Sequence, residues 1–269
     1  MTADDMRQYG FTPGEAIETI AAHWKWWRDR VFGKDDATVK WIVGLSGGKD
    51  STVVAGLAAH VFGKESVIGV MLPQGVQKDI ADARRVASHI GIETIELNIA
   101  NAIMAIEKEV IDKAGFCITD VAKVNLPPRI RMAALYYIAQ NLGKAVVLNT
   151  SNLTEDILGY ATLWGDTCGS YAPIHDYTVG EVVAIGHHLG LPGDLVDKVP
   201  ADGLQEDTDE DRLGLRYSDA DMFIRTGKGE KVVIDRIRAL YKANAFKRRM
   251  IRIEGPVANL PNAASMRWR

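Results

Sequence analysis

The chain alternates between short apolar runs and longer segments whose apolar residues recur every three or four positions. The short runs are typical of buried strands and lie at 41–45, 66–72, 93–99 and 145–149. Helical spacing between them predicts helices at 13–31, 52–62, 78–91, 101–114 and 129–142. Strands that alternate with helices over short connections favour an α/β fold, a Rossmann-like parallel sheet with helices on both faces.

The remainder of the chain is mostly helical in pattern. Helical spacing covers 177–189, 218–225 and 229–249. The segment 195–215 is polar, acidic and rich in Gly and Pro, which predicts a flexible lid. Without internal repeats, the chain is expected to be a single domain over 1–269, with an N-terminal helix within 1–35.

The predicted N-terminal helix carries an apolar and aromatic stripe that includes Trp24 and Trp27. Packing of this stripe against the core is the favoured interpretation. A contact between subunits is the alternative. The stripe alone does not decide between them.

Composition limits the classes of function. A 269-residue chain that is 47% hydrophobic can bury a full core, and its net charge of −3 gives no overall basic field for nucleic acid. The sequence shows neither an 18-residue apolar run nor a leader, so we expect a cytoplasmic protein without a membrane span. Cys117 and Cys168 are too few for a disulfide framework or a zinc site. Basic residues near the C-terminus form either a solvated tail or a phosphate-facing cluster: Lys242, Lys247, Arg248, Arg249, Arg252, Arg267 and Arg269.

A glycine loop joins the first predicted strand to the next helix. It reads Ser46-Gly47-Gly48-Lys49-Asp50-Ser51. Backbone N–H groups at a helix N-terminus favour an anion, and glycines let a ligand approach the backbone closely. The Walker A loop does not fit, because only three residues separate Gly44 from Gly48 and Asp50 follows the lysine. A carboxylate beside phosphate is costly unless a cation lies between them.

The pattern Ser-Gly-Gly-x-Asp-Ser resembles the pyrophosphate loop of the ATP pyrophosphatases, which split ATP into AMP and pyrophosphate. Further motifs follow in order, and over about residues 39–249 the series resembles the ammonia-dependent NAD synthetases. These motifs are Asn125–Met132, which contains Arg129, then Asn149–Tyr160, which contains Glu155, then Trp164-Gly165-Asp166, then Lys198-Val199-Pro200 and Asp209–Gly214.

The resemblance implies a two-step ligase reaction. The nicotinate carboxylate of deamido-NAD attacks the α-phosphorus of ATP, and ammonia then displaces AMP to give NAD. Pyrophosphate needs N–H donors, and the charge between the attacking carboxylate and the triphosphate calls for Mg²⁺. The sequence shows no glutaminase-type Cys–His pairing, so we expect free ammonia or ammonia from a separate protein as the nitrogen donor.

The resemblance also implies roles for individual residues. Asp50 and Glu155 are the expected catalytic carboxylates and Mg²⁺ ligands, and Arg129, Asp166 and Lys247 are expected to bind the dinucleotide substrate. The expected ATP contacts are Gly44, Ser46, Gly47, Gly48, Lys49, Asp50, Ser51, Met71 and Thr150. Members of the family are homodimers with the dinucleotide site near the subunit interface, and the Trp24–Trp27 helix is a candidate contact.

Taken singly, these residues have ordinary interpretations. Glu155 could be an early-helix carboxylate favoured by the helix dipole. Arg129 could be a surface cation, and Asp166 a turn residue. The histidines have no partners at metal-ligand spacing. The order and combination of the motifs favour the functional interpretation.

The chain departs from the family pattern at several positions. Leu163 stands where a lysine is expected, and Val179 stands where a lysine that reaches the ATP phosphates is expected. Other departures are Ser170, Ala201 and Phe246. Three interpretations remain open: deamido-NAD held by other groups, a smaller acid such as nicotinate mononucleotide, or a regulatory paralogue that binds ATP without turnover. The other groups that could hold deamido-NAD are Lys49, Lys123, Lys198 and Arg131.

Overall fold

The structure is a computed structural model that describes residues 3–77, 79–198 and 209–248. Across these ranges four strands form one parallel sheet in the order β3-β2-β1-β4. The strands are β1 (Lys40–Gly44), β2 (Val67–Met71), β3 (Glu93–Glu96) and β4 (Ala145–Val147). The predicted α/β fold is confirmed.

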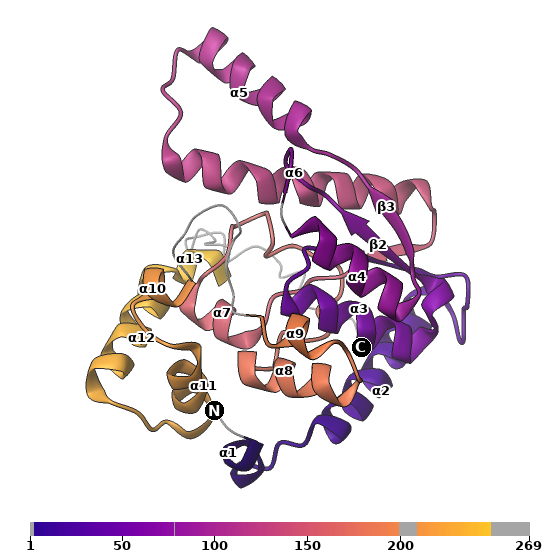
Figure 1. Cartoon of the computed structure of the whole chain (residues 1–269), viewed down its shortest axis with the longest axis vertical. Coiled ribbons are helices and arrows are strands. Elements are labelled where there is room, and N and C mark those ends of the chain that lie inside the picture. Colours follow the sequence, from indigo (N-terminus) through magenta and orange to yellow (C-terminus); the bar gives the residue numbers. More distant parts are fainter. Residues whose placement is uncertain (1–2, 78, 199–208, 249–269) are drawn as a thin grey trace, which may run out of the picture.

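Helices cover both faces of the sheet (Figure 1). One face packs against α2 (Pro13–Phe32), α3 (Lys49–Phe62), α4 (Ile80–Ile90) and α8 (Val179–His188). The other face packs against α5 (Ala100–Ala114) and α6 (Asp120–Asn141). Strand residues alternate between these two cores: Trp41 and Val43 lie with α3, whereas Ile42 lies with α6.

The rest of the described chain is mostly helical, as predicted. A third core cluster forms among α7, α8, α11 and α12. The remaining elements are α1 (Ala3–Gln8), a 3₁₀ turn (Lys64–Ser66), α7 (Leu153–Leu158), α9 (Gly193–Val196), α10 (Asp209–Leu213), α11 (Tyr217–Thr226), α12 (Lys231–Ala243) and α13 (Ala245–Arg248). Within the described ranges, no helix is both long and apolar enough to cross a bilayer.

The sheet order creates a topological switch point beside β1. From β1 the chain runs through α3 to β2 on one side, and it later returns through α6 to β4 on the other side. The loops that leave β1 and β4 therefore meet at the carboxyl edge of the sheet. This is where open α/β sheets bind their ligands.

Several predicted boundaries differ from the structure. Helix α3 begins at Lys49 rather than at residue 52, so Asp50 lies in its first turn. Helix α6 begins at Asp120 rather than at 129 and contains Pro127 and Pro128. The prolines remove two backbone donors, but the helix is long and its first turn is capped by the Thr119 side chain, which accepts from Ala122 N.

The segment 195–215, which was predicted to be a flexible lid, contains helical structure. Helices α9 and α10 lie within or overlap 195–215, and Leu195 and Val196 are buried in the core that includes α3 and α8. Residues 199–208 lie outside the described ranges. The predicted C-terminal helix is divided at Asn244 into α12 and α13.

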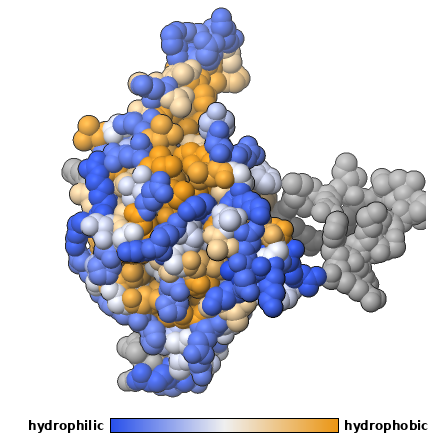
Figure 2. All heavy atoms as spheres, turned by 90° about the vertical axis from the view of Figure 1, so that its right-hand side faces the viewer, coloured by the Kyte–Doolittle hydropathy of each residue, from blue (hydrophilic) through white to orange (hydrophobic). Residues whose placement is uncertain are grey.

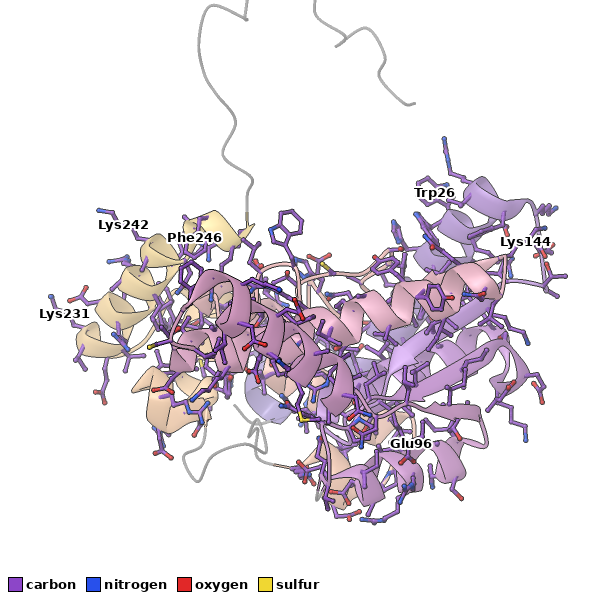
Figure 3. All side chains as sticks on the ribbon, turned by 90° about the horizontal axis from the view of Figure 1, so that it is seen from above. Trp26, Glu96, Lys144, Lys231, Lys242 and Phe246 are labelled. Carbon is purple, nitrogen blue, oxygen red and sulfur yellow. The ribbon has the colours of Figure 1, made fainter. Side chains whose placement is uncertain are left out.

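The aromatic stripe of α2 faces the core. Trp24 is fully buried, and its ring centroid lies 5.1 Å from that of Trp41, 5.3 Å from Phe62 and 4.8 Å from Tyr171. Trp26, on the outer side of α2, is 52% exposed (Figure 3). Trp24 is therefore a core residue, and a subunit contact through α2 would have to use other side chains.

We predict that Trp24→Ala lowers the free energy of unfolding by about 3–5 kcal/mol, because a large buried aromatic is lost and a cavity remains. Trp26→Ala, on the same helix, is the matched control and should cost under about 1 kcal/mol. Urea denaturation measures both. Equal losses in the two variants would contradict the packing of α2 described above.

Candidate active site

The glycine loop is held in shape by its own serines. Gly48 N donates to Ser46 Oγ (3.1 Å), and Ser51 Oγ donates to the Gly48 carbonyl (3.1 Å). Gly47 has a φ of +81°, and a Cβ there would lie 2.8 Å from the Asp79 carbonyl oxygen. Because α3 begins directly after Gly48, its first N–H groups are available to an anion, as the sequence predicted.

Two carboxylates meet at the switch point. Asp50 lies in the first turn of α3, and Glu155 lies in the first turn of α7. Asn152, which is fully buried, connects them: its Nδ2 donates to Asp50 Oδ1 (3.1 Å), and its Oδ1 accepts from Glu155 N (3.0 Å). The Glu155 side chain in turn accepts from Asn152 N (3.4 Å), which completes a capping box.

Sequence reasoning missed Asn152 as a positioning residue. The signal was present, because Asn-x-x-Glu at the start of a helix is a capping-box pattern. The sequence could not show, however, that the Asn152 amide also reaches Asp50 on α3. That contact depends on β1 and β4 being neighbours.

The carboxylate pair is mostly buried, and one cation, Lys49, faces its two negative charges in the contacts given below. Burial, and then the negative charge of Asp50, raise the pKa of Glu155 from 4.5 to about 8, while Lys49 acts in the opposite direction. Lys49 Nζ lies 2.7 Å from Asp50 Oδ2 and 4.0 Å from Glu155 Oε1. Mg²⁺ in proteins is commonly held by one or two carboxylates together with substrate phosphates. This donor set therefore fits Mg²⁺.

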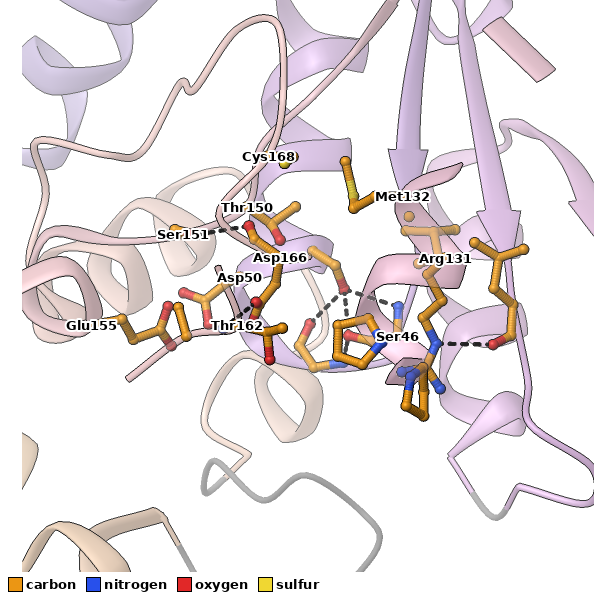
Figure 4. A pocket seen from close by; sticks show the side chains of 18 of the residues that line it. Ser46, Asp50, Arg131, Met132, Thr150, Ser151, Glu155, Thr162, Asp166 and Cys168 are labelled. Carbon is orange, nitrogen blue, oxygen red and sulfur yellow. Dashed lines mark hydrogen bonds between the residues drawn. The ribbon is translucent and has the colours of Figure 1, made fainter. Parts of the chain in front are cut away.

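A cavity of about 570 Å³ joins the glycine loop to the carboxylate pair. Figure 4 shows Asp50 and Glu155 side by side, with Arg131 on the opposite side of the pocket. The sequence-predicted residues among its described lining are Gly44, Ser46, Gly48, Lys49, Asp50, Ser51, Thr150, Glu155, Asp166 and Lys247. The fold thus brings together segments that lie about 200 residues apart in the chain.

Three predicted residues lie outside the described lining: Gly47, Met71 and Arg129. The Met71 side chain is buried in the core beside α3, while Leu72 faces the cavity. Contact of Met71 with a ligand would therefore use its main chain. Arg129 Nε donates to the Leu163 carbonyl (3.1 Å) at the protein surface.

Two opposite charges, Arg131 and Asp166, line the side of the cavity that faces α6. Arg131 Nε donates to the Leu72 carbonyl (3.1 Å), and burial lowers the pKa of Arg131. Burial raises the pKa of Asp166, whose Oδ1 accepts from Thr162 N (2.6 Å). The opposite charges of Arg131 and Asp166 partly compensate each other.

The C-terminal cations hold neighbouring backbone. Lys247 Nζ donates to the carbonyls of Gly159 and Ala161, both at 2.8 Å, and burial lowers its pKa. The Arg248 guanidinium donates to the carbonyl of Asp156 at the end of α7. Neither sequence interpretation anticipated this tie between α13 and α7. The four arginines from 249 onward lie outside the described ranges.

The positions that depart from the family pattern are spread around the site. Val179 is buried at the start of α8, Phe246 is exposed on α13, and Ser170 Oγ lies 3.4 Å from the hydroxyl of Tyr136. Ala201 lies outside the described ranges. Lys198, which lines the cavity, binds two carboxylates of the α4 region, Asp79 (3.1 Å) and Asp82 (2.9 Å).

Comparison with known families shows which family this chain belongs to. The family model for NAD synthase matches residues 20–251. The chain belongs to the NAD synthase family. Relatives named NH₃-dependent NAD(+) synthetase include one from Carboxydothermus hydrogenoformans, 36% identical over 78% of this chain and 86% of its own length. Another, from Pyrococcus furiosus, is 34% identical over 81% of this chain and 89% of its own length.

Two solved structures are similar to most of this chain. An NMN synthetase from Francisella tularensis has a TM-score of 0.81 at 27% identity and covers 91% of this chain and 99% of its own. An NH₃-dependent NAD synthetase from Campylobacter jejuni has a TM-score of 0.72 at 25% identity and covers 91% and 100%. The predicted family is confirmed, and relatives over most of the chain are named as enzymes.

We predict a distinctive pH dependence for the metal-free protein. Glu155 titrates near 4.5 when unfolded and near 8 when folded, so the native state holds an extra proton between these values. Its contribution to stability is complete below about pH 4.5 and is lost as the pH rises through about 8. In EDTA, the unfolding free energy of the wild type minus that of Glu155→Gln should therefore fall between pH 5 and pH 8, roughly the window of that shift. Parallel pH curves for the two proteins would contradict this assignment.

Proposed function

We propose that this protein is an ATP- and Mg²⁺-dependent ligase that amidates the nicotinate carboxylate of deamido-NAD with ammonia. The observation that carries the proposal is the Asp50–Glu155 pair beside the glycine loop, inside one cavity. Membership of the NAD synthase family supports the same reaction. The names of the relatives from Carboxydothermus and Pyrococcus support ammonia as the nitrogen donor.

The reaction consists of two displacements. A carboxylate oxygen of the substrate attacks the α-phosphorus of ATP, the bond from that phosphorus to the bridging oxygen breaks, and pyrophosphate leaves. The nitrogen of ammonia then attacks the acyl carbon, the bond to the AMP oxygen breaks, and AMP leaves with loss of a proton from nitrogen. No covalent nucleophile from the protein is needed, so catalysis consists of positioning and charge neutralisation.

The residues on the ATP side would take the following roles. The N–H groups of the loop from Ser46 to Ser51 hold the pyrophosphate portion of ATP. Asp50 and Glu155 hold Mg²⁺, which when bound neutralises charge between the triphosphate and the attacking carboxylate. Thr150 lines the cavity beside them. Asn152 keeps both carboxylates in position through the contacts described above.

The residues on the substrate side are Arg129, Asp166 and Lys247. Asp166 and Lys247 line the cavity, whereas Arg129 lies outside its described lining and donates to the Leu163 carbonyl. Arg131 adds a half-buried cation to the same cavity. Together these groups could orient an anionic nucleotide towards the loop.

A second candidate acid is nicotinate mononucleotide. Among the comparisons quoted above, the highest TM-score belongs to a protein named NMN synthetase, which superposes over nearly its full length. The sequence departures at Leu163 and Val179 also concern cations that the family pattern provides for phosphate-rich ligands. The chemistry would be unchanged and only the recognition of the acid would differ.

The choice between the two acids can be made by kinetics. With ATP, Mg²⁺ and ammonium present, we predict pyrophosphate release with deamido-NAD and a higher kcat/KM for it than for nicotinate mononucleotide. A reversed ratio would make the mononucleotide the substrate. If neither acid releases pyrophosphate, the ligase proposal fails and a regulatory role in ATP binding takes its place.

The same assay tests the carboxylate pair. Asp50→Ala should lower kcat by at least about 100-fold, because a ligand for the charge-neutralising cation is removed. Asp235→Ala, which removes an exposed carboxylate paired with Lys231 on α12, is the control and should leave the rate unchanged. Near-normal turnover by Asp50→Ala would contradict the role given to the loop.

We further propose that the protein is a homodimer, with α5 and α6 at its interface. In the described chain, Ile103 is the one buried residue of α5. Large apolar side chains are exposed along α5, the turn after it and the start of α6: Met104, Ile106, Ile111, Phe116 and Val121. Figure 1 shows α5 and the start of α6 projecting from the rest of the molecule, and in Figure 2 this projection, at the top of the view, is hydrophilic at its tip with apolar residues below it. Exposed patches of this kind mark contacts between proteins.

Sedimentation velocity tests this interface. The wild type should sediment as a dimer, and the double variant Met104→Glu/Ile111→Glu as a monomer, because it places charge within the apolar patch. Val232→Glu, at an exposed apolar position on α12, is the matched control and should remain dimeric. A wild-type monomer, or a double variant that stays dimeric, would contradict the interface.

A further inference from the structure

Lys49 occupies an unusual place for a lysine. It is the first residue of α3, at the positive end of the helix dipole, and only 4% of it is exposed. Lysines are rarely buried, and a cation at a helix N-terminus is unfavourable. Burial at this position therefore needs specific compensation from neighbouring groups.

The compensation comes from the carboxylate pair and an aromatic ring. Lys49 Nζ lies 2.7 Å from Asp50 Oδ2 and 4.0 Å from Glu155 Oε1. It also lies 5.9 Å from the ring centroid of Tyr217, a residue that is 3% exposed. An ammonium within about 6 Å of an aromatic face is attracted by the ring. The charge of Lys49 is thus directed to the position where Mg²⁺ would be held.

Lys49 also has access to the phosphate side of the site. It lines the same cavity as Ser46 and Ser51 of the glycine loop. A lysine carries its charge on a flexible four-carbon stem, so the ammonium can move between neighbouring anions while the helix stays fixed. Because Lys49 is itself part of the loop, its side chain is long enough to move the ammonium from the carboxylates to a phosphate that the loop holds.

Position 179 is apolar where the family pattern provides a cation. Val179, which is buried, belongs to the same core cluster as Tyr217, and its backbone N–H donates to Thr154 Oγ1 (3.2 Å), next to Glu155. Position 179 therefore contributes no positive charge near the carboxylate pair. Lys49 on α3 supplies positive charge to the pair instead.

We propose that Lys49 is an internal countercation of the site. Its ammonium holds the Asp50–Glu155 pair together in the metal-free protein, gives up both carboxylates when a divalent cation binds, and then neutralises the phosphates of ATP. This role rests on the proposed use of Asp50 and Glu155 as Mg²⁺ ligands. It makes Lys49 a competitor of the metal when ATP is absent and a ligand of the nucleotide when ATP is present.

These two roles predict opposite effects of one substitution. In Lys49→Met, the competing ammonium is lost, so the affinity for a divalent cation without nucleotide should rise about 10-fold, an ordinary coupling for groups in contact. The affinity for ATP at saturating metal should fall about 10-fold, because a charge-assisted contact to phosphate is lost. A lysine that merely supports the fold would not move the two affinities in opposite directions.

The experiment uses Mn²⁺ as the probe, with free Mn²⁺ counted by electron paramagnetic resonance. Binding to the wild type, Lys49→Met and Lys49→Arg is measured without nucleotide. Calorimetry then measures binding of α,β-methylene-ATP at saturating Mn²⁺. Lys49→Arg retains the charge and should stay within about threefold of the wild type in both assays. If Lys49→Met is unstable, Lys49→Gln removes the same charge and takes its place.

Tighter Mn²⁺ binding together with weaker nucleotide binding in the uncharged variant supports the proposal. Unchanged or weaker Mn²⁺ binding, or unchanged nucleotide binding, overturns it. The assays contain neither ammonia nor a carboxylic acid substrate, so they do not depend on which acid is amidated. If no pyrophosphate is released in the kinetic assay, the proposed ligase function fails. The binding results for Lys49 can still be interpreted, because they do not require turnover.

Discussion

The site depends on two carboxylates held close together in a mostly buried place. Asp50 and Glu155 repel each other, and burial makes that repulsion costly, as the raised pKa of Glu155 records. Asn152 fixes both groups by hydrogen bonds, and Lys49 supplies part of the missing positive charge. Two buried carboxylates held this close favour the binding of a divalent cation. Because the glycine loop beside them favours phosphate, the site favours metal and phosphate together rather than either alone.

The strand order makes this constraint possible. Because β4 returns to the side of β1 that β2 leaves open, the loops after β1 and β4 meet at one edge of the sheet. Asp50 enters from the first loop and Glu155 from the second. The same edge is closed by segments from much later in the chain, such as Lys198, which binds α4, and Lys247, which binds the end of α7.

Much of the fold and part of the site could be predicted from local pattern. Apolar runs located the strands, and the Ser46–Ser51 pattern located the anion site, because both depend on neighbours in sequence. Helix boundaries were less accurate: helical spacing predicted a helix over 129–142, yet α6 begins at Asp120 and continues through Pro127 and Pro128. The side-chain directions of Met71 and Arg129 could not be read locally either, since they depend on which face of the sheet or helix meets the cavity.

The sequence by itself determined the parallel α/β architecture, the glycine loop and the family, because periodicity, glycine placement and motif order are properties of the linear chain. Only the tertiary structure decided which charges meet. It placed Asn152 against Asp50 across 102 positions, and it brought Lys49 beside Glu155. It also placed Arg131 in the lining of the cavity and Arg129 outside it. Charge contacts of this kind depend on distances of a few ångströms, which the packing of the sheet and helices sets.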